Sequence, residues 1–310
     1  MSGSGRVAAI DCGTNSVRLL IADRDGGSLR DVTRTMRIVR LGADVDRTGR
    51  LATAALERTA AALVEYRGLI NSADVESVRM VATSAVRDAA NRADFDAMVE
   101  RVLGHRAEVV TGLEEAELSF TGACTGLVDA PAGGVVVADI GGGSTELVRG
   151  SAQSGRVDGA VSLNVGSVRM TERHVRSDPL APAEVAAIEA DVRTALDAAG
   201  TFGAEPGDRL VGVAGTVTTV AAVALGLTRY DSARIHARTL SRDDIDRAVH
   251  ELVGMDRSQR EARAVIHPGR VDVIAAGAVI LATVMARLEA KAVTASEHDI
   301  LDGIALGLPA

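Results

Sequence analysis

The chain has 310 residues, a formal net charge of −8 and 47% apolar residues, enough to bury two sizeable cores. Aromatic residues make up only 2%, tryptophan is absent and Lys291 is the only lysine, so the composition argues against non-specific nucleic-acid binding, which needs basic surfaces and rings that stack on bases. Cys12 and Cys124 form neither a disulfide framework nor a metal motif, and no segment resembles a signal peptide or a membrane span, so we expect a cytoplasmic protein without membrane contact.

The first predicted elements are two strands joined by a glycine-containing turn. Residues 1–5 are expected to be a flexible leader, and an apolar run from Val7 then ends in Asp11. A second strand follows at residues 17–21, so the turn predicts a hairpin, whereas a Rossmann turn opens a helix. Glycine allows a tight turn whose backbone N–H groups point at an anion, which indicates a phosphate loop. Its residues are Gly13, Thr14, Asn15 and Ser16.

Three arginines, Arg34, Arg37 and Arg40, come next and are a candidate patch for a polyanion. A solvated charged strand face is the favoured interpretation of the same run. Apolar residues at helical spacing then predict a helix over 53–70, followed by a short strand over 77–81.

A further helix is predicted from Thr111 to about Cys124. It begins with three acidic residues, Glu114, Glu115 and Glu117, and from the sequence alone these are best explained as complements to the helix macrodipole. Residues 127–134, with one proline and two glycines, are the best linker candidate.

The first hairpin pattern then recurs. Residues 135–139 are an apolar run that ends in Asp139, and residues 145–148 form the next strand. Asp, Gly and Ser occupy the same columns in both copies, which predicts two similar domains, 1–126 and 127–310. An Asp in one such turn usually caps that turn, but a matched pair can hold Mg²⁺. The second turn consists of Gly141, Gly142, Gly143 and Ser144, followed by Thr145.

The second domain is predicted to carry two covering helices. One begins at Pro182 and is closed by Gly200, and the other begins with a variant capping box of Ser241 and Asp244 and runs to about Gly254. Between them, a strand over 210–213 leads into Gly215 and Thr216.

Several of these segments together resemble the exopolyphosphatase / guanosine pentaphosphate phosphohydrolase (Ppx/GppA) family in a short two-domain form. The matching segments span nearly the whole chain and are residues 11–16, 83–87, 114–116, 139–146, 166–172, 215–218 and 268–277. The resemblance implies an α/β fold of two ribonuclease-H-like domains, of the actin, Hsp70 and sugar kinase superfamily, with an inter-domain active-site cleft.

The resemblance also implies roles for individual residues. Glu115 is expected to be the general base for the attacking water, Arg87 to face the phosphate chain, and Glu146 to orient water or metal. Asp11 and Asp139 are expected to hold Mg²⁺ or Mn²⁺, while both turns bind phosphate with the help of Gly215 and Thr216. Arg270 is expected to have a structural or inter-domain ion-pair role.

The function implied is an exopolyphosphatase that releases terminal orthophosphate from inorganic polyphosphate. Hydrolysis of guanosine pentaphosphate is the close alternative, and an ATP-dependent sugar kinase or a nucleotide-binding regulatory protein is more distant. Because the sequence ends at Ala310, without the helical C-terminal domains of long family members, short polyphosphates are expected as substrates. The closing segment, residues 297–303, matches the family only loosely. The last helix, about residues 297–310, could pack back on the first domain. The sequence leaves open whether the protein forms a homodimer.

Overall fold

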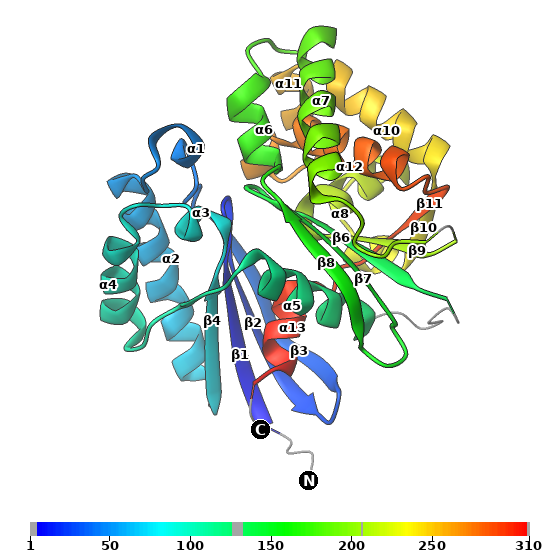
Figure 1. Ribbon diagram of the computed structural model, residues 1–310. Coiled ribbons are helices and arrows are strands. Elements are labelled where there is room, and N and C mark those ends of the chain that lie inside the picture. Colours follow the sequence, from blue (N-terminus) through cyan, green and yellow to red (C-terminus); the bar gives the residue numbers. More distant parts are fainter. Residues whose placement is uncertain (1–4, 126–132, 206, 309–310) are drawn as a thin grey trace. The chain divides into compact units, whose positions relative to one another are not determined.

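The computed structural model describes residues 5–125, 133–205 and 207–308. Contacts divide the chain into two compact units, which are coloured by sequence in Figure 1. Unit 1 comprises residues 1–125 and 300–310, and unit 2 comprises residues 126–299. Residues 1–4 of the expected leader, the predicted boundary at 126/127 and most of the expected linker, residues 127–132, lie outside the described residues. Gly5, also assigned to the leader, instead begins the first strand.

Unit 1 is built on a five-stranded sheet with the order β3-β2-β1-β4-β5. Its strands β1, β2 and β3 are antiparallel neighbours, whereas β4 and β5 continue parallel to β1, and this confirms the predicted first hairpin. The strands are β1 (Gly5–Cys12), β2 (Ser16–Asp25), β3 (Ser28–Ile38), β4 (Ser77–Ala82) and β5 (Glu108–Val109). The helices are α1 (Val45–Thr48), α2 (Thr53–Ser72), α3 (Ser84–Arg87), α4 (Arg92–Leu103), α5 (Gly112–Thr125) and α13 (Ile300–Leu306).

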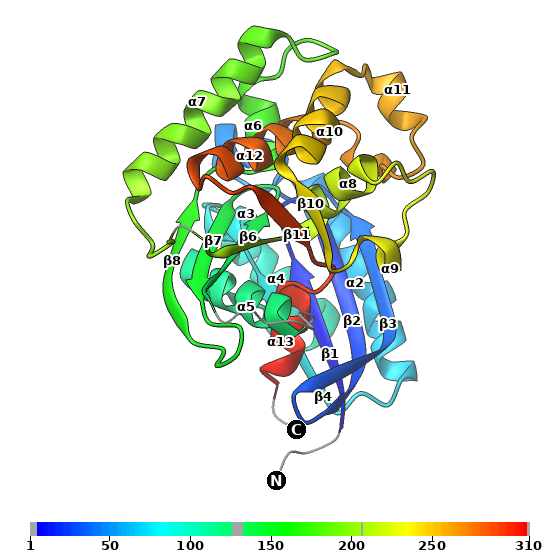
Figure 2. The same cartoon turned by 90° about the vertical axis from the view of Figure 1, so that its right-hand side faces the viewer.

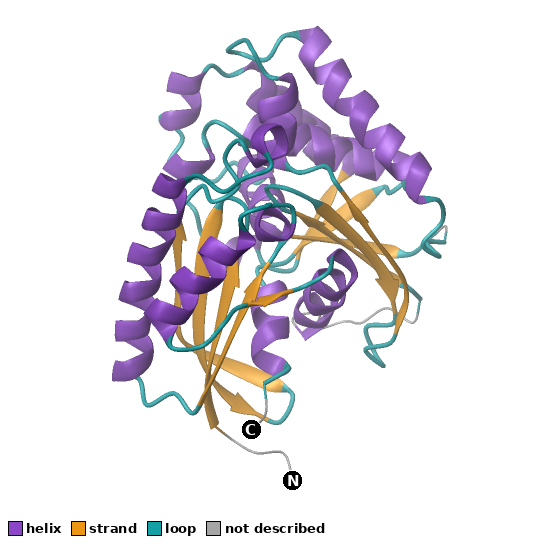
Figure 3. Ribbon diagram, turned by 60° about the vertical axis from the view of Figure 1, so that its left-hand side comes forward, coloured by secondary structure: helices purple, strands orange, loops and turns teal. Residues whose placement is uncertain are grey.

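Helices cover both faces of the unit 1 sheet (Figure 3). Successive side chains of a strand point to opposite faces, so Ala8 and Ile10 of β1 join the core under α2 and α4, while Val7 and Ala9 join the core with α13. Gly303 of α13 lies against α5, since a Cβ there would come within 2.0 Å of the Leu118 carbonyl oxygen. The last helix, which the sequence analysis allowed to pack back on the first domain, is therefore part of unit 1.

Unit 2 repeats this sheet and adds one strand, in the order β10-β11-β9-β6-β7-β8. The β6–β7 hairpin is antiparallel, as the sequence predicts, and β9 and β11 continue parallel to β6. The strands are β6 (Val135–Ile140), β7 (Thr145–Gly150), β8 (Val157–Leu163), β9 (Arg209–Val213), β10 (Arg238–Ser241) and β11 (Ala292–Ala295). The helices are α6 (Ser167–His174), α7 (Pro182–Ala199), α8 (Ala214–Ala224), α9 (Ser232–Ile235), α10 (Arg242–Gly254), α11 (Arg257–Glu261), the 3₁₀ helix η1 (Pro268–Arg270) and α12 (Ile274–Arg287).

One face of the unit 2 sheet packs on helices α7, α8, α10 and α12 in a single aliphatic core (Figure 2). Ile188, Val192 and Leu196 bury the predicted apolar face of α7. The predicted capping box of α10 is confirmed: the Ser241 side chain accepts from the Asp244 backbone N–H, and the Asp244 side chain accepts from the Ser241 N–H.

The two units therefore share one strand order, in which an antiparallel three-stranded meander is extended by parallel strands. This is the ribonuclease-H-like arrangement that the resemblance implied, and the fold class is confirmed. The inter-domain cleft stays a prediction. Within the described part of the chain, no helix is long and apolar enough to cross a membrane.

The arginine run on β3 is held by ion pairs within unit 1. Arg34 donates to Asp31 and, at 2.6 Å, to Asp302 of α13, whose side chain is only 2% exposed, and Arg37 pairs with Glu65 of α2. Arg34 and Arg37 are therefore better explained as ion-paired residues of a charged strand face than as a binding patch for a polyanion.

We predict that Arg34→Ala destabilises unit 1 by about 3 kcal/mol, because it removes the Arg34 guanidinium from the buried Asp302 carboxylate. The matched control is Arg37→Ala, which removes an exposed pair and should cost at most about 1 kcal/mol. Urea denaturation followed by circular dichroism measures both. Equal losses for the two variants would contradict the importance given to the Arg34–Asp302 contact.

Candidate active site

The first phosphate loop follows β1 and is fastened through its carbonyl oxygens. Gly13 N–H donates to Ser16 O at 3.0 Å and closes the turn. The Thr14 carbonyl accepts from Gly42 N–H at 2.8 Å, and the Asn15 carbonyl accepts from the N–H groups of Val39 and Arg40 at 3.0 and 2.9 Å. Gly42 is required at this contact, since a Cβ there would lie 2.3 Å from the Thr14 methyl group.

The second loop follows β6 and is held in the same way by the start of α6. Gly141 N–H donates to Ser144 O at 3.0 Å, as in the first loop. The Gly141 carbonyl accepts from Ser167 N–H at 2.9 Å, and the Gly142 carbonyl accepts from Val168 N–H at 2.8 Å and Arg169 N–H at 3.1 Å. Arg169 Nε also donates to Gly143 O at 2.7 Å.

These tethers determine where the loop N–H groups point. In a planar trans peptide, the carbonyl of one residue and the N–H of the next lie on opposite sides of the chain. With the carbonyls of residues 14 and 15 turned toward residues 39–42, the N–H groups of Asn15 and Ser16 point the other way, and the same geometry applies to residues 142–144 in unit 2. Each loop can thus present backbone donors to phosphate oxygens.

In unit 1, the predicted catalytic pair adjoins the first loop. Thr14 Oγ1 and Ser84 Oγ are 2.9 Å apart, and Ser84 begins α3, which ends at Arg87. Arg87 Nη1 donates to Glu115 Oε2 at 3.1 Å and to Val110 O at 3.0 Å. Arg87 and the buried Glu115 therefore lie together, joined to the phosphate loop through one short helix.

The neighbouring Glu114 has a different role, because it caps α5. Its carboxylate accepts from the Thr111 backbone N–H at 2.7 Å and from the Thr111 hydroxyl at 2.9 Å, and these bonds lower the pKa of Glu114. The macrodipole explanation thus fits the exposed Glu114, while Glu115 is turned into the protein.

Asp11 is engaged by a cation from the next strand. Its Oδ2 accepts from Arg18 Nε at 2.9 Å and Nη2 at 2.7 Å, and the two residues are direct cross-strand neighbours in β1 and β2. Burial, aided by the nearby Asp11 charge, raises the pKa of the Cys12 thiol, so Cys12 acts as a packing residue here.

In unit 2, the position equivalent to Arg18 holds an acid. Asp139 of β6 lies directly across from Glu146 of β7, and both side chains are buried. Ser162 of β8 donates to Glu146 Oε1 at 2.7 Å. Glu146 is 1% exposed, so its side chain does not face solvent. Thr145 uses its hydroxyl to hold the Val165 carbonyl at 2.7 Å, so only its backbone could serve the predicted phosphate contact.

The start of α8 completes the unit 2 residues. Asp139 of β6 pairs with Val213, the last residue of the neighbouring strand β9. Gly215 and Thr216 follow Val213 in the chain and therefore lie beside the second loop. Gly277 of α12 allows Thr216 and Ser167 to pack against the α12 backbone, since a Cβ added at residue 277 would lie 2.7 Å from Thr216 Cγ2. The Arg270 guanidinium packs directly against Gly215, since a Cβ added at residue 215 would lie 2.1 Å from Arg270 Cζ.

The structure thus gathers the predicted residues in two groups. Unit 1 brings Asp11, loop residues 13–16, Arg87 and Glu115 together, and unit 2 brings Asp139, loop residues 141–145, Glu146, Gly215 and Thr216 together. Arg18, Ser84 and Ser162 are partners of these residues that were not predicted from the sequence. Aligning the two hairpins would have revealed Arg18, since it occupies the column of Glu146.

Comparisons with known proteins identify relatives. A sequence model of the Ppx/GppA phosphatase family matches residues 20–308. A Mycobacterium tuberculosis protein named Exopolyphosphatase 2 is 49% identical and aligns over 98% of both chains. An Aeromonas salmonicida protein named guanosine-5'-triphosphate,3'-diphosphate pyrophosphatase is 31% identical over 99% of this chain and 60% of its own length. The crystal structure of an exopolyphosphatase-like protein superposes with a TM-score of 0.94 at 44% identity, over 98% of this chain and 97% of that chain.

We predict that Gly166→Ala lowers turnover of a phosphoanhydride substrate by about a hundredfold, because displacement of a binding loop by an ångström has effects of that size. A Cβ at residue 166 would lie 2.5 Å from the Gly142 carbonyl group, so the second loop must shift. Gly254→Ala is the matched control, since nothing lies within 4 Å of its Cβ position. Steady-state kinetics measures both, with thermal unfolding as a check of the fold. Wild-type turnover in Gly166→Ala would show that the second loop does not contribute.

Proposed function

We propose that this chain, which belongs to the Ppx/GppA phosphatase family, is an exopolyphosphatase that releases terminal orthophosphate from inorganic polyphosphate, with short chains as expected substrates. The observation that carries the proposal is the buried Glu115 held by Arg87 next to a phosphate loop. The 49% identity with a protein named Exopolyphosphatase 2 supports the same substrate.

Glu115 is the proposed general base. Hydrolysis of a phosphoanhydride requires a water aligned with the breaking bond, and a positioned carboxylate can accept its proton as it attacks phosphorus. Arg87 fixes the Glu115 carboxylate at 3.1 Å, and Arg87 in turn is held by the Val110 carbonyl. The base is therefore oriented before substrate binds.

Backbone donors and arginines are proposed to bind the phosphate chain. The loop N–H groups can bind non-bridging oxygens, and a guanidinium adds a planar pair of donors to the charge that develops during transfer. Arg87 in unit 1 and Arg270, whose guanidinium lies against Gly215 in unit 2, are the arginines that we propose for this role. The structural or inter-domain ion-pair role expected of Arg270 from the sequence stays a prediction.

Mg²⁺ or Mn²⁺ is the proposed cofactor, and unit 2 fits it better than unit 1. Asp139 and Glu146 offer carboxylate oxygens, which these ions prefer, from two directly opposed and buried strand positions. Asp11 already faces the Arg18 guanidinium. No group of three or more acidic, His or Cys ligands occurs in the described residues, so phosphate oxygens and water would complete the coordination. A bound ion would neutralise phosphate charge.

Guanosine pentaphosphate is the less favoured substrate, because the relative with that activity in its name is 31% identical, against 49% for the exopolyphosphatase. Family membership gives no support to a sugar kinase or a non-catalytic regulator. Rates with polyphosphates of graded length and with guanosine pentaphosphate would decide between the substrates. We further propose that the chain works in the cytoplasm, where the thiols of Cys12 and Cys124 would stay reduced.

We predict that Glu115→Gln lowers kcat by about a hundredfold or more while polyphosphate binding is retained, because an amide keeps the shape of the side chain but accepts no proton. Phosphate release and equilibrium binding measure the two effects. Glu114→Gln is the adjacent control: it weakens the α5 cap, costing about 1 kcal/mol of stability, and should keep kcat near wild type. The reverse pattern, with Glu114→Gln inactive and Glu115→Gln active, would reject the assignment.

We also predict that activity needs Mg²⁺ or Mn²⁺ and is lost in excess chelator without a change in circular dichroism. Electron paramagnetic resonance of Mn²⁺ measures binding independently of turnover. Asp139→Asn and Glu146→Gln should weaken Mn²⁺ binding at least tenfold, the scale of losing one charged ligand (about 1.4 kcal/mol). Asp11→Asn is the matched comparison and should bind Mn²⁺ nearly as well as wild type. If Asp11→Asn alone abolished binding, the ion would belong to unit 1.

A further inference from the structure

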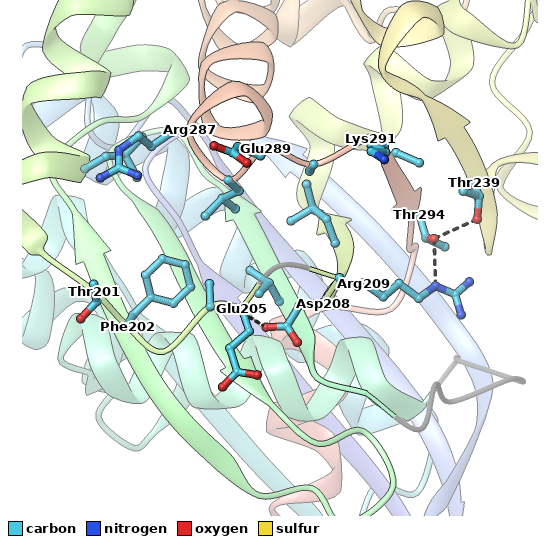
Figure 4. Close-up of a pocket in the computed structure, with 18 of the residues that line it drawn as sticks. Thr201, Phe202, Glu205, Asp208, Arg209, Thr239, Arg287, Glu289, Lys291 and Thr294 are labelled. Atoms are coloured by element: carbon cyan, nitrogen blue, oxygen red, sulfur yellow. Dashed lines mark hydrogen bonds between the residues drawn. The ribbon is translucent and has the colours of Figure 1, made fainter.

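Unit 2 contains a cavity of about 690 Å³ at the amino ends of β6, β9 and β11. Val136, Arg209 and Ala292 line it from these strands, while the end of α7 and the turn after α12 form other walls (Figure 4). Ligand sites in proteins commonly measure about 300–1,000 Å³. The volume is therefore sufficient for a small organic molecule.

The cavity lies at the opposite ends of the strands from the phosphate-binding residues. Val136 lines the cavity, whereas Asp139 precedes the second loop on the same strand β6. Arg209 lines the cavity at the start of β9, and the other end of β9 leads into Gly215. A molecule in this cavity would thus occupy a site separate from the proposed phosphate site.

Part of the lining is apolar. Phe202, one of three phenylalanines in the chain, contributes its ring, and Leu196 and Leu288 line the cavity with it. Figure 4 shows the Phe202 ring beside Thr201, at a distance along the cavity from Arg209 and Thr294. A ring or compact aliphatic body would cover this part.

The other end carries positive charge and hydroxyl groups. Arg209 Nε donates to Thr294 Oγ1 at 3.2 Å, and the Thr239 and Thr294 hydroxyl oxygens are 2.9 Å apart (Figure 4). Lys291, which precedes β11, also lines the cavity and has an exposed side chain. A guanidinium, an ammonium and two hydroxyls are suitable donors for a carboxylate or a phosphate monoester.

Two acidic residues of the lining are paired with an arginine. Asp208 and Glu205 pair with Arg149 at 3.2 and 3.5 Å. These pairs reduce the repulsion that the two carboxylates would exert on an anion at the Arg209 end. Glu289, in the turn after α12, is the third acidic residue of the lining.

We propose that this cavity is a binding site for a small organic anion. Its apolar body lies against Phe202 and Leu196, and its carboxylate or phosphate lies at Arg209 and Lys291. The site is distinct from the substrate site of the proposed function.

Because Lys291 is the only lysine in the chain, it gives a specific probe. Reductive ¹³C-methylation keeps the ammonium charge and labels Lys291 and the α-amino group, whose NMR signals can be followed separately. The Lys291→Gln variant assigns the signal. Titration with 4-phenylbutyrate and with phenyl phosphate distinguishes a carboxylate from a phosphate ligand, and acetate and inorganic phosphate control for simple anion binding.

We expect one or both aromatic anions to shift the Lys291 signal saturably at millimolar concentrations, with the α-amino signal unmoved and with much smaller effects from acetate and inorganic phosphate. Arg209→Gln should weaken binding of the aromatic anion about tenfold, because it removes one charge-assisted hydrogen bond. Arg193→Gln, on an exposed part of α7, is the control and should leave it unchanged. The proposal is overturned if neither aromatic anion shifts Lys291, if acetate and inorganic phosphate shift it equally, or if Arg209→Gln binds as wild type. Each readout is independent of turnover, so failure here leaves the proposed phosphatase activity untouched.

Discussion

Both phosphate loops depend on hydrogen bonds made to their carbonyl oxygens from the protein behind them. In unit 1 the donors are backbone N–H groups of residues 39–42, and in unit 2 they are those at the start of α6. Because the peptide unit is planar, fixing these carbonyls fixes the opposite N–H groups, so the donors that we propose for phosphate oxygens are oriented without substrate. The close packing at Gly42 and Gly166 follows from this constraint, since a side chain at either position would displace the loop.

The two units share this pattern of hydrogen bonds to the loop carbonyls but differ in the side chains beside the loops. One strand position faces the loop aspartate in each unit, and it holds Arg18 in unit 1 and Glu146 in unit 2. The first gives a carboxylate–guanidinium pair, whereas the second gives two carboxylates with Ser162 donating to one of them. The same strand geometry therefore places a cation beside Asp11 and a second carboxylate beside Asp139, and this difference is why we assign the proposed metal to unit 2.

Local patterns in the sequence were sufficient for the two hairpins and for the limits of α2, α5, α7 and α10, whereas the separation of Glu115 from Glu114 came from the family resemblance. Such features depend on alternation, capping residues and glycine turns within a few positions of one another. Features that join distant segments were not predictable in this way. The packing of α13 into unit 1, the contact of Ser84 with Thr14 and the Arg270 guanidinium on Gly215 each depend on tertiary structure. For Asp11 the matched motif suggested a metal ligand, and the cross-strand Arg18, which donates to the Asp11 carboxylate, changes that interpretation.

The central claim is that water, activated by Glu115, attacks the terminal phosphorus of polyphosphate. It is tested most directly by phosphorus NMR of polyphosphate incubated with catalytic amounts of the protein in ¹⁸O-enriched water. The account predicts that orthophosphate appears from the first turnover, carries a single ¹⁸O atom, and accumulates while the number of chain ends stays constant. A rise in chain ends before orthophosphate appears, or orthophosphate without ¹⁸O, would contradict it.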